Sequence, residues 1–102
     1  LPHLNLGTVD GHACAPTLRQ ALIAAMATQQ RFTHVTDGRF KGGHITRHYG
    51  QPAHNVHAVQ LEMCWRTYMD EGPPAVWSEA QAAEATPLLR KLVRTMIDWR
   101  PE

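Results

Sequence analysis

The residues of this chain that could carry out chemistry lie close together, between positions 39 and 62. Glu62 stands near the end of an apolar stretch that is typical of a strand, and Arg47 follows a glycine pair. A carboxylate in apolar surroundings is a candidate general base, because loss of solvation favours its protonated form. A guanidinium group binds a carboxylate through two parallel hydrogen bonds. The combination indicates a site for a small acidic molecule.

The glycine pair Gly42-Gly43 lies between basic residues, five positions before Arg47 at its start. Residues without side chains let a backbone approach a bound molecule closely and donate N–H hydrogen bonds to it. Two structural alternatives stay open at this point. The glycine pair fits a plain turn equally well, and Arg47 could form a structural ion pair, for instance with Glu62.

The chain has seven histidines, but their spacing gives little support for a metal site. His44 and His48 are four residues apart, a spacing that suits two ligands on one helix face. However, the preceding glycine pair and the β-branched Ile45 and Thr46 disfavour a helix there. The segment also lacks the H-E-x-x-H pattern of zinc hydrolases. We therefore expect no metal ligands among these residues.

Length, composition and net charge limit the class of protein. With 102 residues, 43% of them hydrophobic and 19% charged, the chain predicts one folded domain over residues 1–102. A net charge of +1 argues against a nucleic-acid binder, which needs a basic excess. The longest apolar runs fall short of the roughly 18 residues of a membrane span. We expect a soluble, cytoplasmic protein, and the start at Leu1 suggests a fragment of something longer.

The elements that must position the candidate residues alternate between strands and helices, which predicts an α/β fold with helices flanking a layered sheet. In the last predicted strand, Gln60 and Glu62 share one face and Val59, Leu61 and Met63 share the other. The carboxyl end of such a strand is where open α/β sheets place their ligands. The predicted elements are strands at 1–8, 32–36 and 56–63, a brief extended piece at 45–46, a helix from Pro16 to about Gln30, and a helix from Glu79 that is capped by Ser78 and interrupted at Pro87. We expect the apolar stripe of the last helix to pack in the core.

Three strings resemble a known family. LNLGTVDGHACAPTL, DGRFKGGHITRHYGQP and VHAVQLEMCWRTYMDE, with IDW in the last helix, resemble the C-terminal part of the N-formylglutamate amidohydrolases. These enzymes are the N-formylglutamate deformylases of histidine degradation, which release formate and L-glutamate from N-formyl-L-glutamate. The resemblance covers essentially the whole chain and implies the C-terminal part of a zinc-carboxypeptidase-like (phosphorylase/hydrolase-like) fold.

The same resemblance implies roles for individual residues. Glu62 corresponds to the glutamate that activates the attacking water, Arg47 is a candidate for holding a substrate carboxylate, and Gly42 and Gly43 would shape the pocket. Zinc or a similar divalent metal is implied for the full-length enzyme, with its ligands upstream of this chain. The partners implied are the small-molecule substrate and the rest of the same chain, so residues 1–102 alone would be inactive.

Two further functions stay open beside this one. The first is a non-catalytic protein on the same scaffold that binds an acidic small molecule through Arg47 and Lys41. The second is a nucleic-acid module whose basic and aromatic patch consists of Arg39, Lys41, Arg47, His48 and Tyr49. The near-neutral net charge disfavours it.

Overall fold

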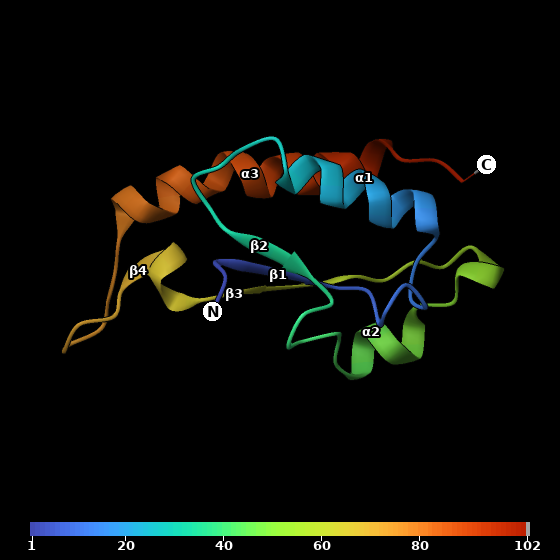
Figure 1. The fold of residues 1–102 in the computed structure, drawn as a ribbon, viewed down its shortest axis with the longest axis horizontal. Helices are drawn as coiled ribbons and strands as arrows, with labels where there is room; N and C mark the ends of the chain where they lie inside the picture. The colour runs from blue at the N-terminus through green and yellow to red at the C-terminus, as the bar shows by residue number, and fades with distance from the viewer. Residues whose placement is uncertain (102) are drawn as a thin grey trace.

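A computed structural model describes residues 1–101. Three strands form its central sheet in the order β2-β1-β3 (Figure 1). Strand β1 (Leu4–Gly7) pairs in parallel with β2 (His34–Thr36) and antiparallel with β3 (Gln60–Met63). The parallel pair is joined through α1 (Pro16–Met26), as parallel strands require a crossover. The predicted α/β class, a sheet with flanking helices, is confirmed.

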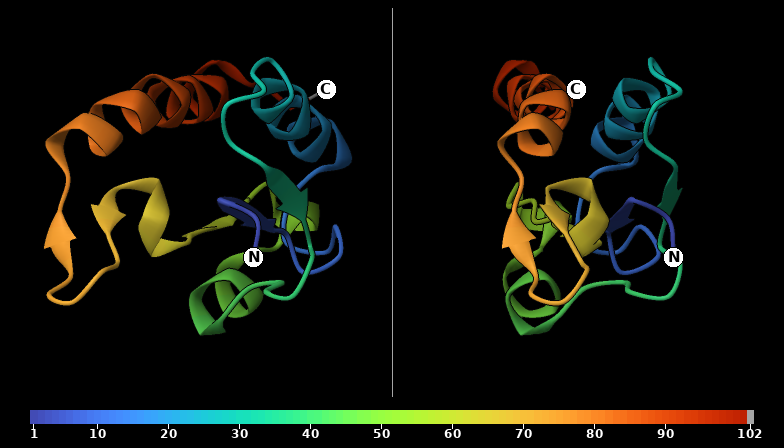
Figure 2. Two further views of the ribbon diagram at one scale, coloured as in Figure 1. Left: turned by 60° about the vertical axis from the view of Figure 1, so that its left-hand side comes forward. Right: turned by 90° about the vertical axis from the view of Figure 1, so that its left-hand side faces the viewer.

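Helices α1 and α3 (Glu79–Asp98) lie side by side over one face of the sheet, whereas α2 (His44–Tyr49) lies beyond its other face (Figure 2). We call the first face the covered face. The apolar core fills the space between it and the two helices, and its bulkiest fully buried side chains come from β1 and α1: Leu4, Leu18, Leu22 and Met26.

Helix α1 begins where predicted and ends earlier. Pro16 occupies its first turn, where a missing N–H costs nothing. The helix stops at Met26, where the Gln29 side chain replaces the backbone groups with which a further helical turn would form hydrogen bonds. Its amide nitrogen donates to the carbonyls of Met26 and Phe32, at 2.9 and 3.0 Å, and its oxygen accepts from the Phe32 N–H at 2.7 Å.

The extended piece predicted at Ile45 and Thr46 is wrong, because these residues lie in helix α2. The Arg47 N–H donates to the Gly43 carbonyl at 3.0 Å, and the Gly50 N–H donates to the Thr46 carbonyl at 3.1 Å. Thr46 is buried. Tertiary packing therefore overrides the weak strand preference of the two β-branched residues.

The third strand is shorter than predicted. Residues 56–59 precede β3, and they are held by an isolated bridge between Gln51 and Val56 and by a 3.0 Å hydrogen bond from the Ala58 N–H to the Ala13 carbonyl. A short 3₁₀ helix, Pro52–His54, lies inside the turn that the bridge closes. Another 3₁₀ helix, Trp65–Thr67, follows β3.

A small hairpin and the last helix complete the chain. Strands β4 (Met69–Asp70) and β5 (Val76–Trp77) pair antiparallel, so the proline-containing segment between them forms the tip of a hairpin. Ser78 caps α3 as predicted, since its hydroxyl accepts from the Gln81 N–H at 3.2 Å. The helix continues through Pro87, so the interruption predicted there is wrong, and the Thr86 hydroxyl donates to the Ala82 carbonyl at 2.8 Å.

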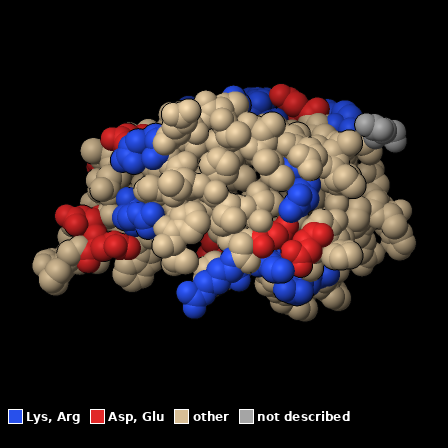
Figure 3. Space-filling model, in the orientation of Figure 1, with Lys and Arg blue, Asp and Glu red and all other residues tan. Residues whose placement is uncertain are grey.

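The apolar stripe of α3 meets the core along one side only. Leu88 and Leu92 are buried, but Val93 and Ile97 are 58% and 54% exposed. Our prediction that the whole stripe packs in the core is therefore wrong for its outer half. Within residues 1–101, no helix combines the length and apolar character that crossing a bilayer needs. Basic and acidic side chains are interspersed on the face shown in Figure 3.

Candidate active site

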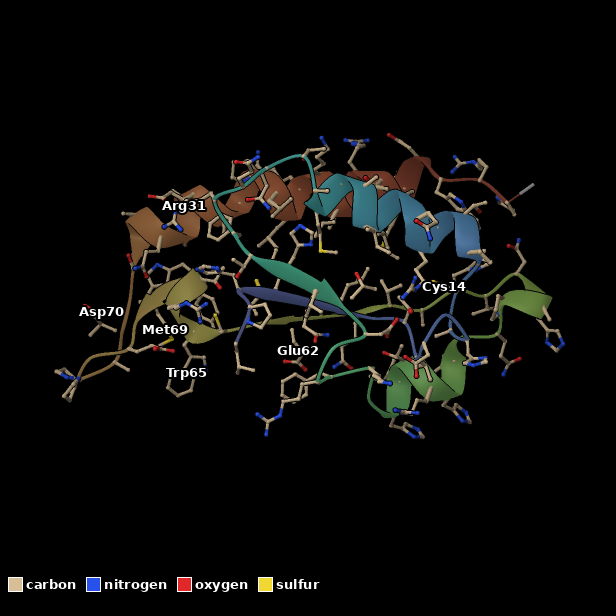
Figure 4. The ribbon with its side chains drawn as sticks, viewed as in Figure 1. Cys14, Arg31, Glu62, Trp65, Met69 and Asp70 are labelled. Atoms are coloured by element: carbon tan, nitrogen blue, oxygen red, sulfur yellow. The ribbon has the colours of Figure 1, made fainter. Side chains whose placement is uncertain are left out.

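The candidate residues lie on the face of the sheet that points away from α1 and α3. We call it the open face and define it by Asn5, Val35, Gln60 and Glu62. Asn5 lies opposite Val35 on one neighbouring strand and opposite Glu62 on the other. Figure 4 shows the Glu62 side chain directed away from the two long helices. The alternation along β3 thus places Gln60 and Glu62 together, as predicted.

Glu62 does not lie at the ligand-binding edge that we predicted. Because β3 runs antiparallel to β1 and β2, its carboxyl end lies at the opposite edge from theirs. Glu62 pairs with Asn5 within the sheet, and its side chain is exposed. Residues 1–101 therefore leave this carboxylate exposed to solvent, contrary to our expectation, although apolar side chains such as Val35 and Met63 line the small cavity beside it.

Two hydrogen bonds connect Glu62 to the glycine pair. The Gln60 side-chain nitrogen donates to a Glu62 carboxylate oxygen at 2.8 Å. The Gln60 side-chain oxygen accepts from the Gly43 N–H, also at 2.8 Å. Gln60 thus lies between the candidate base and the loop of residues 37–43.

Arg47 is anchored to the same loop. Its Nε donates to the Gly42 carbonyl at 2.8 Å, and its side chain is exposed. Within residues 1–101 Arg47 forms no ion pair, and its two terminal nitrogens donate no hydrogen bond. The structural alternative, an ion pair with Glu62, is therefore absent from this part of the chain. The terminal nitrogens can bind an anion.

Gly42 needs to be glycine for a steric reason. Its φ is +135°, and a Cβ there would lie 3.1 Å from side-chain atoms of Thr46 and Val9. The loop also rests directly on the end of β1, where a Cβ on Gly7 would lie 2.8 Å from the Lys41 backbone. Close approach of the loop to the sheet thus fixes the Gly42 backbone. Gly43 is the N-cap of α2.

A small cavity opens beside Glu62 on the open face. Its volume is about 100 Å³, and it is lined by Asn5, Arg39, Phe40 and Cys64 among others. Sequence reasoning missed Asn5 and assigned Arg39 to the disfavoured nucleic-acid patch. The signal for Asn5 was a polar residue between Leu4 and Leu6 in a buried strand.

A larger hollow of about 530 Å³ along the outer side of α3 has no acid, histidine or cysteine in its lining, so it offers no hydrolytic chemistry.

The amino end of the loop is fixed by an ion pair between the Asp37 side chain, which is 3% exposed, and that of Arg19, which is 27% exposed. Asp37 accepts hydrogen bonds from the Thr8 N–H at 2.7 Å, from the Thr8 hydroxyl, and from an Arg19 terminal nitrogen at 3.1 Å. Burial by itself raises the pKa of the Asp37 carboxyl, but these hydrogen bonds outweigh it and hold the pKa below its usual value. The carboxylate joins the ends of β1 and β2.

Lys41 forms an ion pair with Asp10 at 2.9 Å, which weakens the case for Lys41 as a group that binds an acidic ligand.

The histidines are arranged differently from our prediction. His44 and His48 do share a face of helix α2, and their rings stack at 5.1 Å. Within residues 1–101, however, no three histidine, cysteine or acidic side chains cluster as metal ligands would. His57 has a structural role, since its Nδ1 accepts from the Ala15 N–H at 3.0 Å.

Comparison with known proteins identifies this scaffold. A sequence profile of the N-formylglutamate amidohydrolases matches residues 1–69, which include the whole open face. The chain belongs to the N-formylglutamate amidohydrolase family.

Individual relatives agree with the profile. The chain is 50% identical over 103 residues to an N-formylglutamate deformylase of Pseudomonas aeruginosa, and 45% identical over 102 residues to one of Pseudomonas putida. Each alignment covers 100% of this chain, which spans about 38% of the length of these curated relatives. A crystal structure of N-formylglutamate amidohydrolase from Ralstonia eutropha JMP134 superposes with a TM-score of 0.76 and 26% identity, covering 92% of this chain and 33% of that one.

Proposed function

We propose that this chain is the C-terminal part of an N-formylglutamate deformylase, which hydrolyses N-formyl-L-glutamate to formate and L-glutamate. The observation that carries the proposal is the identity of 45% and 50% to two such deformylases over the full chain. The proposal includes a zinc-carboxypeptidase-like fold for the whole enzyme. The arrangement of Glu62 and Arg47 around one loop supports the proposed activity, because hydrolysis of an acidic amide needs a base and an anion-binding group.

Glu62 acts as the general base in this proposal. One of its oxygens accepts the Gln60 hydrogen bond, and its exposure gives the other access to water. Glu62 takes a proton from the attacking water, whose oxygen bonds to the formyl carbon. The C–N bond then breaks, and Glu62 passes the proton to the leaving amine, so that formate and glutamate are released.

Arg47 holds a carboxylate of the substrate through its free terminal nitrogens, while Gly42 and Gly43 shape the loop beneath it. Arg39 is a second candidate for this role, because it lines the cavity beside Glu62. Binding at a guanidinium group would keep the formyl amide close to the base.

A metal does not fit the described residues by themselves. Residues 1–101 hold no group of three side chains suited to a metal ion. In our proposal zinc or a similar divalent ion belongs to the full-length enzyme, on ligands outside this chain. Such an ion would polarise the formyl carbonyl and activate water.

A cytoplasmic location and a place in histidine degradation belong to the same proposal. The two cysteines support this location. Cys14 and Cys64 are free thiols, as is usual in a reducing compartment.

The test measures formate release from N-formyl-L-glutamate by the full-length parent and by its Glu62→Gln variant. We expect turnover to fall by about 10²- to 10⁴-fold, the usual contribution of general base catalysis, with little change in stability. Glu71→Gln is the matched control, because Glu71 is also exposed, outside the open face. Near-normal turnover by Glu62→Gln would remove Glu62 from this role.

A non-catalytic binder of an acidic small molecule is the second candidate. The exposure of Glu62 favours it, since the described residues do not exclude bulk water from this carboxylate as a closed active site does. Calorimetry with N-formylglutamate and glutamate, with and without zinc, separates the two candidates. Tight binding of both compounds without formate release would support the binder.

A further inference from the structure

One peptide group links Arg47 to Gln60. The carbonyl of Gly42 accepts from Arg47 Nε at 2.8 Å. The N–H of Gly43, which belongs to the same peptide group, donates to the Gln60 side-chain oxygen at 2.8 Å. The two hydrogen bonds lie on opposite sides of the peptide, so the peptide connects a side chain of α2 with a side chain of β3.

Gln60 carries this connection to Glu62. In a carboxamide the oxygen accepts and the nitrogen donates. Because the Gly43 N–H occupies the oxygen, the nitrogen turns toward Glu62, to which it donates at 2.8 Å. The backbone of the loop therefore sets the orientation of the Gln60 amide.

All the donors in this chain of hydrogen bonds point the same way, from the Arg47 cation to the Glu62 anion. Hydrogen bonds aligned in series polarise one another and strengthen each other. The central peptide is also held in place, because Gly42 packs closely against Thr46 and Val9. A rigid peptide transmits a displacement of one side chain to the other.

We propose that Gln60 is a positioning residue that couples anion binding at Arg47 to the orientation of Glu62. This inference rests on the proposed function for the roles of the two end residues. A substrate carboxylate that binds Arg47 thereby stabilises the chain of hydrogen bonds that orients the base. Substrates without that carboxylate lose catalytic rate as well as affinity.

A double-mutant cycle in the full-length enzyme tests the coupling. Gln60→Met removes the amide at nearly constant volume, and we expect kcat to fall about tenfold with KM nearly unchanged, since one hydrogen bond to a charged group is lost. Arg47→Ala should lower kcat in the parent but not further in Gln60→Met. Gln20→Met, at an exposed glutamine of α1 away from the open face, is the control for the same chemical change and should leave both constants unchanged. Fully additive effects on kcat would overturn the coupling.

A second readout needs no turnover. In ¹⁵N spectra of the parent, we expect the Gln60 side-chain resonance to shift when glutamate, the probe ligand, is added, and to lose most of this shift in Arg47→Ala. Glu62→Gln should leave the Gly43 amide response intact. A glutamate-bound parent with no Gln60 shift refutes the inference. If the parent releases no formate but the shift persists, the proposed function fails and the coupling stands.

Discussion

The two faces of the central sheet differ although the same strands build both. On β1, Leu4 and Leu6 point to the covered face and are 1% and 2% exposed. Asn5, between them, points to the open face and hydrogen bonds to the Phe40 backbone. On β3, Leu61 packs against the core, whereas Glu62 is exposed.

Because of this difference, the covered face stabilises the fold, whereas the open face holds the groups that can bind a ligand. The covered face is complete, because α1 and α3 bury its apolar side chains and apolar burial favours folding. The open face is covered in part by the loop of residues 37–43, and its charged and amide groups keep unused hydrogen-bonding capacity. A substitution should therefore act on folding at one face and on ligands at the other.

The largest expected stability effect belongs to the covered face. Leu22→Ala should lower the free energy of unfolding by about 2–5 kcal/mol, since Leu22 is 1% exposed and truncation leaves a cavity. Chemical denaturation measures it. The matched control is Ile45→Ala on α2, where the side chain is 71% exposed and we expect about 0.5 kcal/mol or less. Equal losses at both positions would contradict the dependence of stability on burial at the covered face.

An intermediate effect on stability is expected at Asp37, whose carboxylate joins the ends of β1 and β2. Asp37→Asn should cost about 1–3 kcal/mol near neutral pH, because Arg19 and Thr8 lose a buried charged acceptor. The folded pKa of Asp37 is lowered, so its contribution is present above the unfolded pKa and is lost as the pH falls through the folded one. Denaturation series between pH 2 and 7 measure both. An Asn variant with the parent's acid sensitivity would contradict this assignment.

The smallest effect in free energy is expected at the open face. Arg47→Ala in the full-length enzyme should raise KM for N-formylglutamate about tenfold, which corresponds to about 1.4 kcal/mol, with the unfolding free energy unchanged. Arg39→Ala is the comparison variant, since Arg39 lines the cavity beside Glu62. A larger rise in KM for Arg39→Ala would transfer the anion-binding role to Arg39, and an unchanged KM for Arg47→Ala would remove Arg47 from it.

Several features were predictable because they depend on short-range patterns. Alternation placed Gln60 and Glu62 on one face, Pro16 marked the start of α1, and Ser78 marked the start of α3. Helix α2 was not predictable in this way. Ile45 and Thr46 favour a strand locally, and the burial of Thr46 is what selects the helix.

The sequence by itself determined the alternation along β3, the starts of α1 and α3 and, through its motifs, the family. Only the tertiary structure decided that β3 is antiparallel, which removed Glu62 from the predicted edge of the sheet. It alone showed that one peptide group joins Arg47 to Gln60. The physical reason is that periodicity is a local property of a chain. Strand direction and hydrogen bonds between distant residues depend on how the whole chain packs.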